Sequence, residues 1–282
     1  MKVAFQGETG AFSEEASLAL FPESQPVPNP TFEAVFEAVR DGSSDRGVIP
    51  IENSLHGSVH QNYDLLREHA LIITDEIQLR IRHNLLTVRG SNLENIRAVY
   101  SHPQALGQCR DFLRSTLAGV EIISSYDTAG AAKMVAEKND PQCAAIAGAV
   151  AGTEYDLITL AANIESNHQN YTRFLALARS EDERPRAQER DVPMKTSIVY
   201  AQQDNVPGSL FKSLAVFALR DIDLFKIESR PLVGSPGKYL FYLDLAGSMS
   251  DEPVQNALRH LEEVAASVKI LGTYAVGSIM DG

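Results

Sequence analysis

Residues 2–15 read KVAFQGETGAFSEE, and this stretch decides the fold class. The apolar run Lys2–Gln6 predicts a buried strand, and the glycines after it permit close backbone approach. Ser13 is predicted to cap a helix whose first turn carries Glu14 and Glu15, because acidic side chains suit the positive end of a helix. Short apolar runs then alternate with helical patterns as far as residue 179. Such alternation is typical of an α/β fold.

The rest of this region follows the same pattern. Thr31 is predicted to cap a second helix, in which apolar residues recur at helical spacing until Gly42 stops it. Further strands are predicted at residues 46–51, 77–82, 96–100, 120–124, 143–147 and 171–178.

The chain changes character at residues 180–194, which read SEDERPRAQERDVPM. This charged stretch holds two prolines and almost no apolar residues, so it predicts a domain linker. Beyond it, strands are predicted at 196–202, 223–233, 238–246 and 268–274, with helices at 209–219 and 252–265. The order βαββαβ predicts a small ferredoxin-like domain.

The composition excludes several classes of protein. A chain of 282 residues favours two domains, and a net charge of -12 argues against partners such as nucleic acid or anionic membranes. Only Cys109 and Cys143 occur, which predicts buried thiols in a reducing compartment. We find no signal peptide at the start and no run of about 20 apolar residues, so a soluble, cytoplasmic protein is expected.

The sequence predicts neither a metal nor an organic cofactor. The histidines are scattered, and His56 and His60 lie four residues apart without a third ligand nearby. There is no P-loop and no complete dinucleotide fingerprint. Polar residues instead follow several strands, where ligands bind in open α/β sheets. They predict a site made of hydroxyls, amides and backbone N–H groups, with one arginine, Arg173.

Three motifs carry a resemblance to a known family. NYTRFL at 170–175, PIENS at 50–54 and SHPQAL at 101–106 resemble the prephenate dehydratase family, and the resemblance covers the whole chain. NVPGSL at 205–210 and ESRP at 228–231 are similar to its regulatory ACT domain. The resemblance implies a catalytic domain at 1–179, with two lobes like a periplasmic binding protein. Lobe a would contain about residues 1–77 and 164–179, and lobe b would contain about residues 78–163. A linker at 180–194 and an ACT domain at 195–282 would follow.

The resemblance also implies roles for particular residues. Thr172 would act on the departing hydroxyl of prephenate. Because a threonine hydroxyl is a poor acid, we interpret Thr172 as a positioned hydrogen-bond donor. Arg173 would bind a substrate carboxylate, or else form a salt bridge between lobes, since neighbours on a strand point to opposite faces. Glu52 is either an acid or a hinge residue. The expected substrate contacts are Asn53, Ser54, Ser101, Gln104, Gln108, Thr128, Arg173 and Glu52.

A second ligand is implied for the C-terminal domain. In related ACT domains phenylalanine binds between subunits, which predicts a dimer through these domains and a homotetramer. The expected effector contacts are Asn205, Val206, Pro207, Gly208, Ser209, Leu210, Glu228 and Ser229. Alternatively, Glu228 and Arg230 form a surface ion pair of little energetic weight.

Two other functions stay open. Residues 6–7, 10–13, 62–66 and 127–132 are similar to plant arogenate dehydratases. Arogenate carries an ammonium where prephenate has a ketone, so a preference for it needs an acceptor such as Asp127 or Glu52. A non-catalytic amino-acid-binding protein is the second alternative. We favour prephenate as the substrate.

Overall fold

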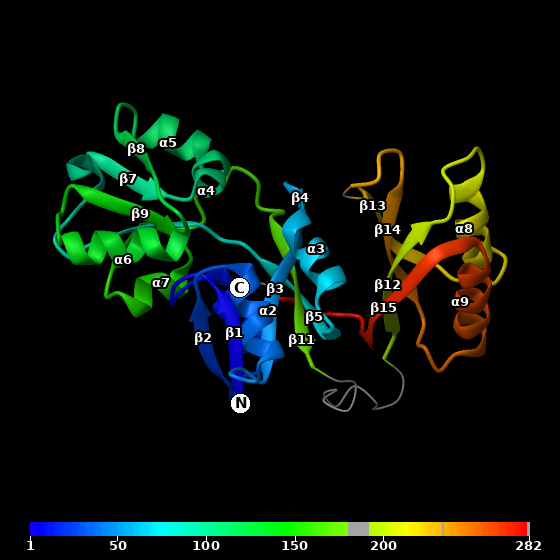
Figure 1. Ribbon diagram of the computed structural model, residues 1–282. Helices are drawn as coiled ribbons and strands as arrows, with labels where there is room; N and C mark the ends of the chain where they lie inside the picture. Colours follow the sequence, from blue (N-terminus) through cyan, green and yellow to red (C-terminus); the bar gives the residue numbers. More distant parts are fainter. Residues whose placement is uncertain (180–191, 233, 281–282) are drawn as a thin grey trace. The chain divides into compact units, whose positions relative to one another are not determined.

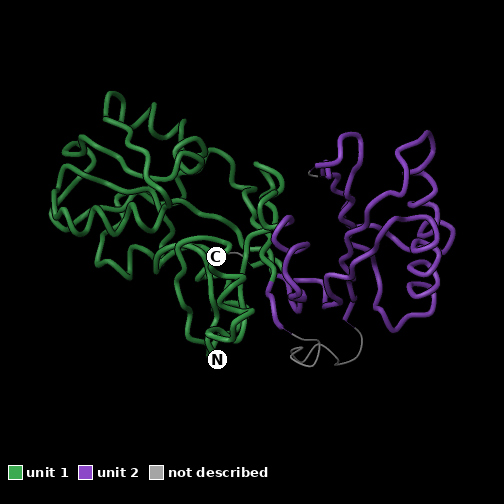
Figure 2. The backbone as a smooth tube through the Cα atoms, in the orientation of Figure 1, with its two compact units in different colours: residues 1–62, 77–175, 278–282 green, residues 63–76, 176–277 purple. Residues whose placement is uncertain are grey.

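The computed structural model describes residues 1–179, 192–232 and 234–280. Most of the predicted linker, and Val233 of a predicted strand, lie outside the described residues. The chain forms two compact units (Figure 2). Unit 1 contains residues 1–62, 77–175 and 278–282, and unit 2 contains residues 63–76 and 176–277. Among the described residues, no helix has the length and apolar character needed to cross a bilayer.

The larger sheet has the strand order β16-β5-β11-β3-β1-β2, with β4 paired to β3 (Figure 1). Its strands are β1 (Lys2–Gln6), β2 (Gln25–Asn29), β3 (Arg46–Asn53), β4 (Gly57–Ser58), β5 (Ile72–Arg80), β11 (Tyr171–Ala178) and β16 (Ile279–Met280). Helices α1 (Phe12–Leu20) and α2 (Phe32–Arg40) pack on β1 and β3. Strand β1 is parallel to β2 and β3, as strand–helix–strand connections require.

A second sheet, of order β10-β6-β9-β7-β8, forms the other lobe of unit 1. Its strands are β6 (Asn84–Thr87), β7 (Ala98–Ser101), β8 (Glu121–Ser124), β9 (Cys143–Ala147) and β10 (Ile158–Ala161). Helices α4 (Pro103–Gln108) and α5 (Arg110–Thr116) cover one face; α6 (Thr128–Lys138) and α7 (Ala149–Glu154) cover the other. A short 3-10 helix, η1 (Leu93–Asn95), precedes β7. The chain crosses between the sheets at 81–83 and 162–170, which confirms the predicted two-lobed α/β fold.

Local chemistry explains where the predicted elements differ from the observed ones. Helix α1 begins at Phe12 and no side chain caps it, so the prediction of Ser13 as the cap is wrong. Thr31 does cap α2, because its Oγ1 accepts a hydrogen bond from the N–H of Ala34 at 3.2 Å. The sequence pattern does not predict β2, whose two prolines are tolerated because it lies at a sheet edge.

Unit 2 contains the predicted ferredoxin-like domain. Its elements are β12 (Met194–Gln202), α8 (Ser209–Ala218), β13 (Leu224–Pro231), β14 (Tyr239–Ala246), α9 (Glu252–Val264) and β15 (Ala265–Ala275). The sheet order is β13-β14-β12-β15, and its described pairings are antiparallel. One face packs Ile198, Tyr200 and Phe241 against α8 and α9. The βαββαβ prediction is therefore confirmed.

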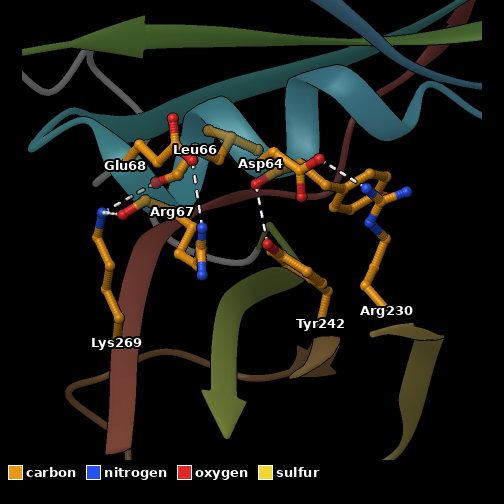
Figure 3. A network of polar contacts seen from close by, with 8 residues as sticks. Asp64, Leu66, Arg67, Glu68, Arg230, Tyr242 and Lys269 are labelled. Atoms are coloured by element: carbon orange, nitrogen blue, oxygen red, sulfur yellow. Dashed lines mark hydrogen bonds and ion pairs between the residues drawn. The ribbon is translucent and has the colours of Figure 1, made fainter. Parts of the chain in front are cut away.

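The other face of this sheet holds the last turns of helix α3 (His60–Glu68) (Figure 3). Lys269 of β15 donates its three ammonium hydrogens to the carbonyls of Leu66, Arg67 and His69, at 2.7–2.9 Å. The Tyr242 hydroxyl donates to the Tyr63 carbonyl at 3.0 Å. A cation on the last carbonyls of a helix satisfies acceptors that have no partner within the helix.

A buried ion pair fastens β5 to the same sheet. Lys195 of β12 lies 2.6 Å from Glu76, and their side chains are only 6% and 1% exposed. The same Glu76 oxygen accepts the N–H of Gly277 at 2.9 Å. Because both charges are removed from water, each depends on the other for compensation.

We expect Glu76→Gln to lower the free energy of unfolding by about 3–5 kcal/mol, because it leaves the Lys195 ammonium buried without its counter-charge. The measurement is the urea unfolding midpoint, read by circular dichroism. Asp156→Asn is the matched control, since the Arg89–Asp156 pair is 72% and 79% exposed and its loss should leave the midpoint almost unchanged. Equal midpoint shifts for the two variants would contradict our prediction that the buried Glu76–Lys195 pair matters more to stability than the exposed Arg89–Asp156 pair.

Candidate active site

A cavity of about 640 Å³ lies in unit 1, where the loops of its two lobes meet. The residues around it come from the ends of strands and the starts of helices, as expected for an open α/β sheet. Its polar lining includes Gln6, Ser13, Thr31, Asn53, His56, Ser58, Gln61, His83, His102, Gln104, Gln108, Tyr126, Asp127, Thr128 and Thr172. Residues more than 100 positions apart in the sequence thus share one cavity.

The Asn53 amide connects β3 with β11 at the floor of this cavity. Its Nδ2 lies 2.9 Å from Thr172 Oγ1, 2.8 Å from Asn170 Oδ1 and 3.2 Å from the Tyr171 carbonyl, and its two hydrogens are shared among these three acceptors. Its Oδ1 accepts from the N–H groups of Leu55 and His56, which shapes the following turn. Because Thr172 Oγ1 accepts from Asn53, its own hydroxyl hydrogen remains available to donate.

Polar contacts continue from Asn53 along one side of the cavity. His56 Nδ1 lies 3.2 Å from Asn53 Oδ1 and 3.2 Å from Gln108 Nε2. Gln108 Oε1 lies 2.6 Å from His83 Nε2. Since an amide oxygen accepts, His83 carries its hydrogen on Nε2. Burial lowers the pKa of His83, so the neutral imidazole is favoured.

The lining of the cavity combines helix starts with polar side chains. None of the described residues that line it is lysine or arginine. Helices α1 and α6 begin at the cavity, with Phe12 and Thr128 in its lining, and the start of α4 lies there with Gln104. N–H groups at helix starts attract anions, so this arrangement suits carboxylates even in an acidic protein.

Side chains of the loop 7–11 contact the lobe that carries α6. Glu8 accepts from the Tyr126 hydroxyl at 2.8 Å and from Lys133 Nζ at 2.9 Å, and these partners lower the pKa of Glu8. The Tyr126 ring lies over Gly130, where even a methyl group would overlap it. Burial raises the pKa of the adjacent Asp127, which caps α6 by accepting the Gly130 N–H.

Five of the residues predicted from the sequence meet in the cavity lining: Asn53, Gln104, Gln108, Thr128 and Thr172. Thr172 and Phe174 both line it, so the alternation of a strand turns Arg173 to the other face. Arg173 and Glu52 are not among the lining residues, and their substrate contacts stay predictions.

Ser54 and Ser101 lie elsewhere for identifiable reasons. Strand β7 extends through Ser101, one residue beyond its predicted end, so this side chain is fully buried and donates to the Ile146 carbonyl at 2.6 Å. Ser54 donates to the Gln169 carbonyl at 2.8 Å and accepts the Tyr171 N–H at 3.0 Å. Both serines therefore contact backbone groups and are not among the lining residues, and their substrate contacts stay predictions.

The sequence analysis did not select several residues that line the cavity, including His56, His83, His102, Gln6 and Gln61. His102 lies inside the SHPQAL motif, and its Nδ1 accepts the Gln104 N–H at 3.3 Å. Its place in that motif is a feature of the sequence from which His102 could be predicted as a site residue. Nothing in the local pattern around His83 or Gln61 distinguishes them from ordinary polar residues.

Comparisons with known proteins agree with one another. The family model for prephenate dehydratase matches residues 3–182. An arogenate dehydratase/prephenate dehydratase of Arabidopsis thaliana is 47% identical, over 99% of this chain and 74% of its own length. The solved structure of a prephenate dehydratase from Arthrobacter aurescens in complex with L-Phe is 31% identical, with a TM-score of 0.88 over 98% of this chain and 90% of that one. A structure described as a quorum-quenching acylase is 33% identical, with a TM-score of 0.87 over 98% of each chain.

The buried imidazole of His83 should make stability depend on pH. Its pKa is lowered in the folded protein, so below an ordinary value of about 6.5 the unfolded chain binds a proton that the folded protein does not. Stability is therefore lost as pH falls. We expect wild-type protein to lose more of its urea midpoint between pH 7.5 and pH 5 than His83→Gln does. Parallel losses would show that His83 titrates normally.

Proposed function

This chain belongs to the prephenate dehydratase family, and we propose that it converts prephenate to phenylpyruvate by decarboxylative dehydration, in the biosynthesis of phenylalanine. The observation that supports this most directly is the Thr172 hydroxyl. It lies at the cavity and is oriented by the Asn53 amide, so that its hydrogen is free to meet a leaving group. The reaction needs no metal or organic cofactor, because the product ring becomes aromatic.

The reaction balances without a redox partner. The bond between the ring and its carboxylate breaks and its electron pair enters the ring, while the bond to the 4-hydroxyl breaks. Carbon dioxide and water leave, and one proton is consumed. Thr172 donates a hydrogen bond to the departing oxygen as negative charge grows on it, which is the moment at which a fixed donor contributes most.

The carboxylates of the substrate need partners as well. Helices α1 and α6 begin at the cavity, where N–H groups attract anions, and the side-chain amide of Gln104 lines it as well. Arg173 lies on the face of β11 opposite to Thr172. Our prediction that it binds a carboxylate therefore requires its side chain to move or to attract the carboxylate from that face. The fixed backbone donors meet the same need without such a movement.

Arogenate dehydration is the second candidate function. The A. thaliana relative carries both activities in its name, and the chemistry is the same apart from an ammonium in place of the ketone. We also propose that the protein is cytoplasmic. A turnover assay with purified protein separates both reactions from a non-catalytic binding protein.

We further propose that unit 2 contains an ACT domain through which phenylalanine inhibits the enzyme. The A. aurescens structure contains L-Phe. In this chain, Gly208 adopts a left-handed conformation with φ +88° at the start of α8, and Ser209 Oγ lies 2.8 Å from each of the carbonyls of Asp204 and Val206, to either of which its one hydrogen can be donated. The Ser209 N–H also donates to the Val206 carbonyl at 3.0 Å, so the loop 205–210 is held in one conformation before α8.

A second copy of the chain is the proposed partner. Strand β13 lies at an edge of its sheet, and Phe225 and Ile227 on it are each 49% exposed. Phe211 of α8 is 75% exposed. An open strand edge beside exposed apolar side chains is suited to pairing with an identical edge. Of the two residues in the alternative ion pair, Glu228 lies 3.6 Å from Lys226, while Arg230 pairs with Asp64 at 2.6 Å.

We infer that helix α3 links the binding of phenylalanine to catalysis. Gln61 in its first turn lines the cavity of unit 1, and its last carbonyls are held by Lys269 in unit 2. A helix is stiff along its axis, so a shift of the sheet that carries Lys269 and Tyr242 moves the whole of α3. Inhibition then follows if phenylalanine favours a sheet position that displaces Gln61.

We expect Thr172→Val to lower kcat for prephenate by about 10²-fold or more, because the shape is kept and the donor is lost. Thr172→Ser keeps the hydroxyl and is the matched control, for which kcat should stay within about tenfold of wild type. The measurement is the release of phenylpyruvate at saturating prephenate. A valine variant with near-normal kcat would remove Thr172 from the mechanism.

We expect Gly208→Asp to abolish phenylalanine binding by calorimetry, since an aspartate is strained at φ +88° and repels the ligand carboxylate. Lys269→Met should behave differently: binding persists, and inhibition weakens because the end of α3 is released. Full-length protein that neither binds phenylalanine nor is inhibited by it contradicts the regulatory proposal.

A further inference from the structure

Three side chains in unit 1 form a hydrogen-bonded row from a buried ring to an exposed one. They are His83, Gln108 and His56, and all three line the cavity. His83 Nε2 lies 2.6 Å from Gln108 Oε1, and Gln108 Nε2 lies 3.2 Å from His56 Nδ1. His83 is only 2% exposed, whereas His56 is exposed. The row therefore connects the interior of the protein with the space that a substrate would occupy.

The main chain holds the two inner members of this row in place. The His83 carbonyl accepts the Ile164 N–H at 2.9 Å, and the Gln108 carbonyl accepts the Ser166 N–H at 2.8 Å. Glu165, between these two donors in the sequence, accepts the His83 N–H at 3.0 Å. One short segment thus fixes both His83 and Gln108, so their side chains meet in a defined geometry.

The His83 ring sets the direction of the hydrogen bonds. Burial lowers the pKa of His83, so the ring is neutral and carries one hydrogen. Its Nδ1 is enclosed and makes no hydrogen bond with the described residues, and the Phe12 ring meets it edge-on with centroids 5.7 Å apart. Buried N–H groups are almost always paired. The hydrogen therefore lies on Nε2, where Gln108 Oε1 accepts it.

The Gln108 amide passes this direction on to His56. Because its oxygen is held by His83, the amide presents its NH₂ group to His56 Nδ1, which accepts. Asn53 Oδ1 also lies 3.2 Å from this nitrogen, but it already accepts the N–H groups of Leu55 and His56 at 3.0 and 3.1 Å. An amide oxygen has two lone pairs, so it needs no hydrogen from the ring. His56 therefore carries its hydrogen on Nε2.

A hydrogen on His56 Nε2 suits an anionic substrate. Carboxylates only accept hydrogen bonds, and none of the described lining residues is lysine or arginine, so neutral donors have to supply part of their binding. Without the His83 donor, the Gln108 amide can turn over and present its oxygen to His56. The ring would then carry its hydrogen on Nδ1, and the lone pair on Nε2 would repel a carboxylate.

We propose that His56 donates a hydrogen bond from Nε2 to a carboxylate of the substrate, and that His83 is a positioning residue that keeps the hydrogen on that nitrogen through Gln108. The inference rests on the proposed decarboxylative dehydration and adds to it a binding residue and the residue that orients it.

The first test needs no substrate. Ring ¹⁵N chemical shifts of histidine-labelled protein show which nitrogen carries the hydrogen, and His56→Gln assigns the signals of His56. We expect Nε2–H in wild-type protein and a shift toward Nδ1–H in His83→Phe, which keeps a ring but has no donor. His83→Gln supplies an amide donor and should restore Nε2–H. Wild-type protein with the hydrogen on Nδ1 overturns the inference, and so does a His83→Phe variant in which the His56 signals are unchanged.

The second test is kinetic. His56→Phe and His83→Phe should each raise KM for prephenate about tenfold and keep kcat within about threefold of wild type, because a hydrogen bond to a carboxylate is lost from the ground state and the transition state alike. The double variant should be no worse than His56→Phe, since His83 acts through His56. His260→Phe, in α9 of unit 2, is the matched control and should leave KM unchanged.

Two kinetic outcomes overturn the inference. One is that the effects of His56→Phe and His83→Phe on KM multiply in the double variant, and the other is a loss of kcat at unchanged KM. Wild-type protein that does not turn over prephenate overturns the proposed function, and this inference with it. The position of the hydrogen on His56 is read independently of activity, so the two failures are distinguishable.

Discussion

The side-chain amide of Asn53 is the contact on which the arrangement of the site depends. Strands β3 and β11 are separated by more than 100 residues, and at their ends the Asn53 Nδ2 group holds Asn170, Tyr171 and Thr172 together. The Asn53 Oδ1 at the same time fixes the turn that carries His56. One planar amide therefore sets the positions of a donor hydroxyl, an imidazole and a loop. Replacing this amide would leave several buried polar groups without a hydrogen-bond partner.

Electrostatics explains how an acidic protein can offer a site to an anion. The net charge of -12 opposes an anionic substrate at long range. Helices α1 and α6 begin at the cavity, and the positive ends of their dipoles favour an anion there. The carboxyl of Asp127 also lies in the lining, where burial raises its pKa.

Helix α3 is shared by the two compact units, and its contacts differ along its length. At its beginning, Asn62 donates to the Pro50 carbonyl at 2.6 Å in unit 1, beside the cavity. At its end, Lys269, Tyr242 and Arg230 hold it to the sheet of unit 2 (Figure 3). Apolar packing accompanies these polar contacts, since Tyr63, Leu65 and Leu66 are buried and the Tyr63 ring meets the Tyr242 ring edge-on with centroids 4.9 Å apart.

The sequence by itself determined the α/β class, the order βαββαβ of the second domain and most of the strands, because hydrophobic period and glycine turns are local properties. It also selected Asn53, Gln104, Gln108, Thr128 and Thr172, since motifs at strand ends have a local signature. Only the tertiary structure decided which polar residues meet. Ser101 is buried because β7 runs one residue further than its pattern indicates, and Arg173 turns away because strand neighbours alternate. His83 joins the cavity through a contact with Gln108, 25 residues away, and such long-range contacts leave no periodic trace in a single sequence.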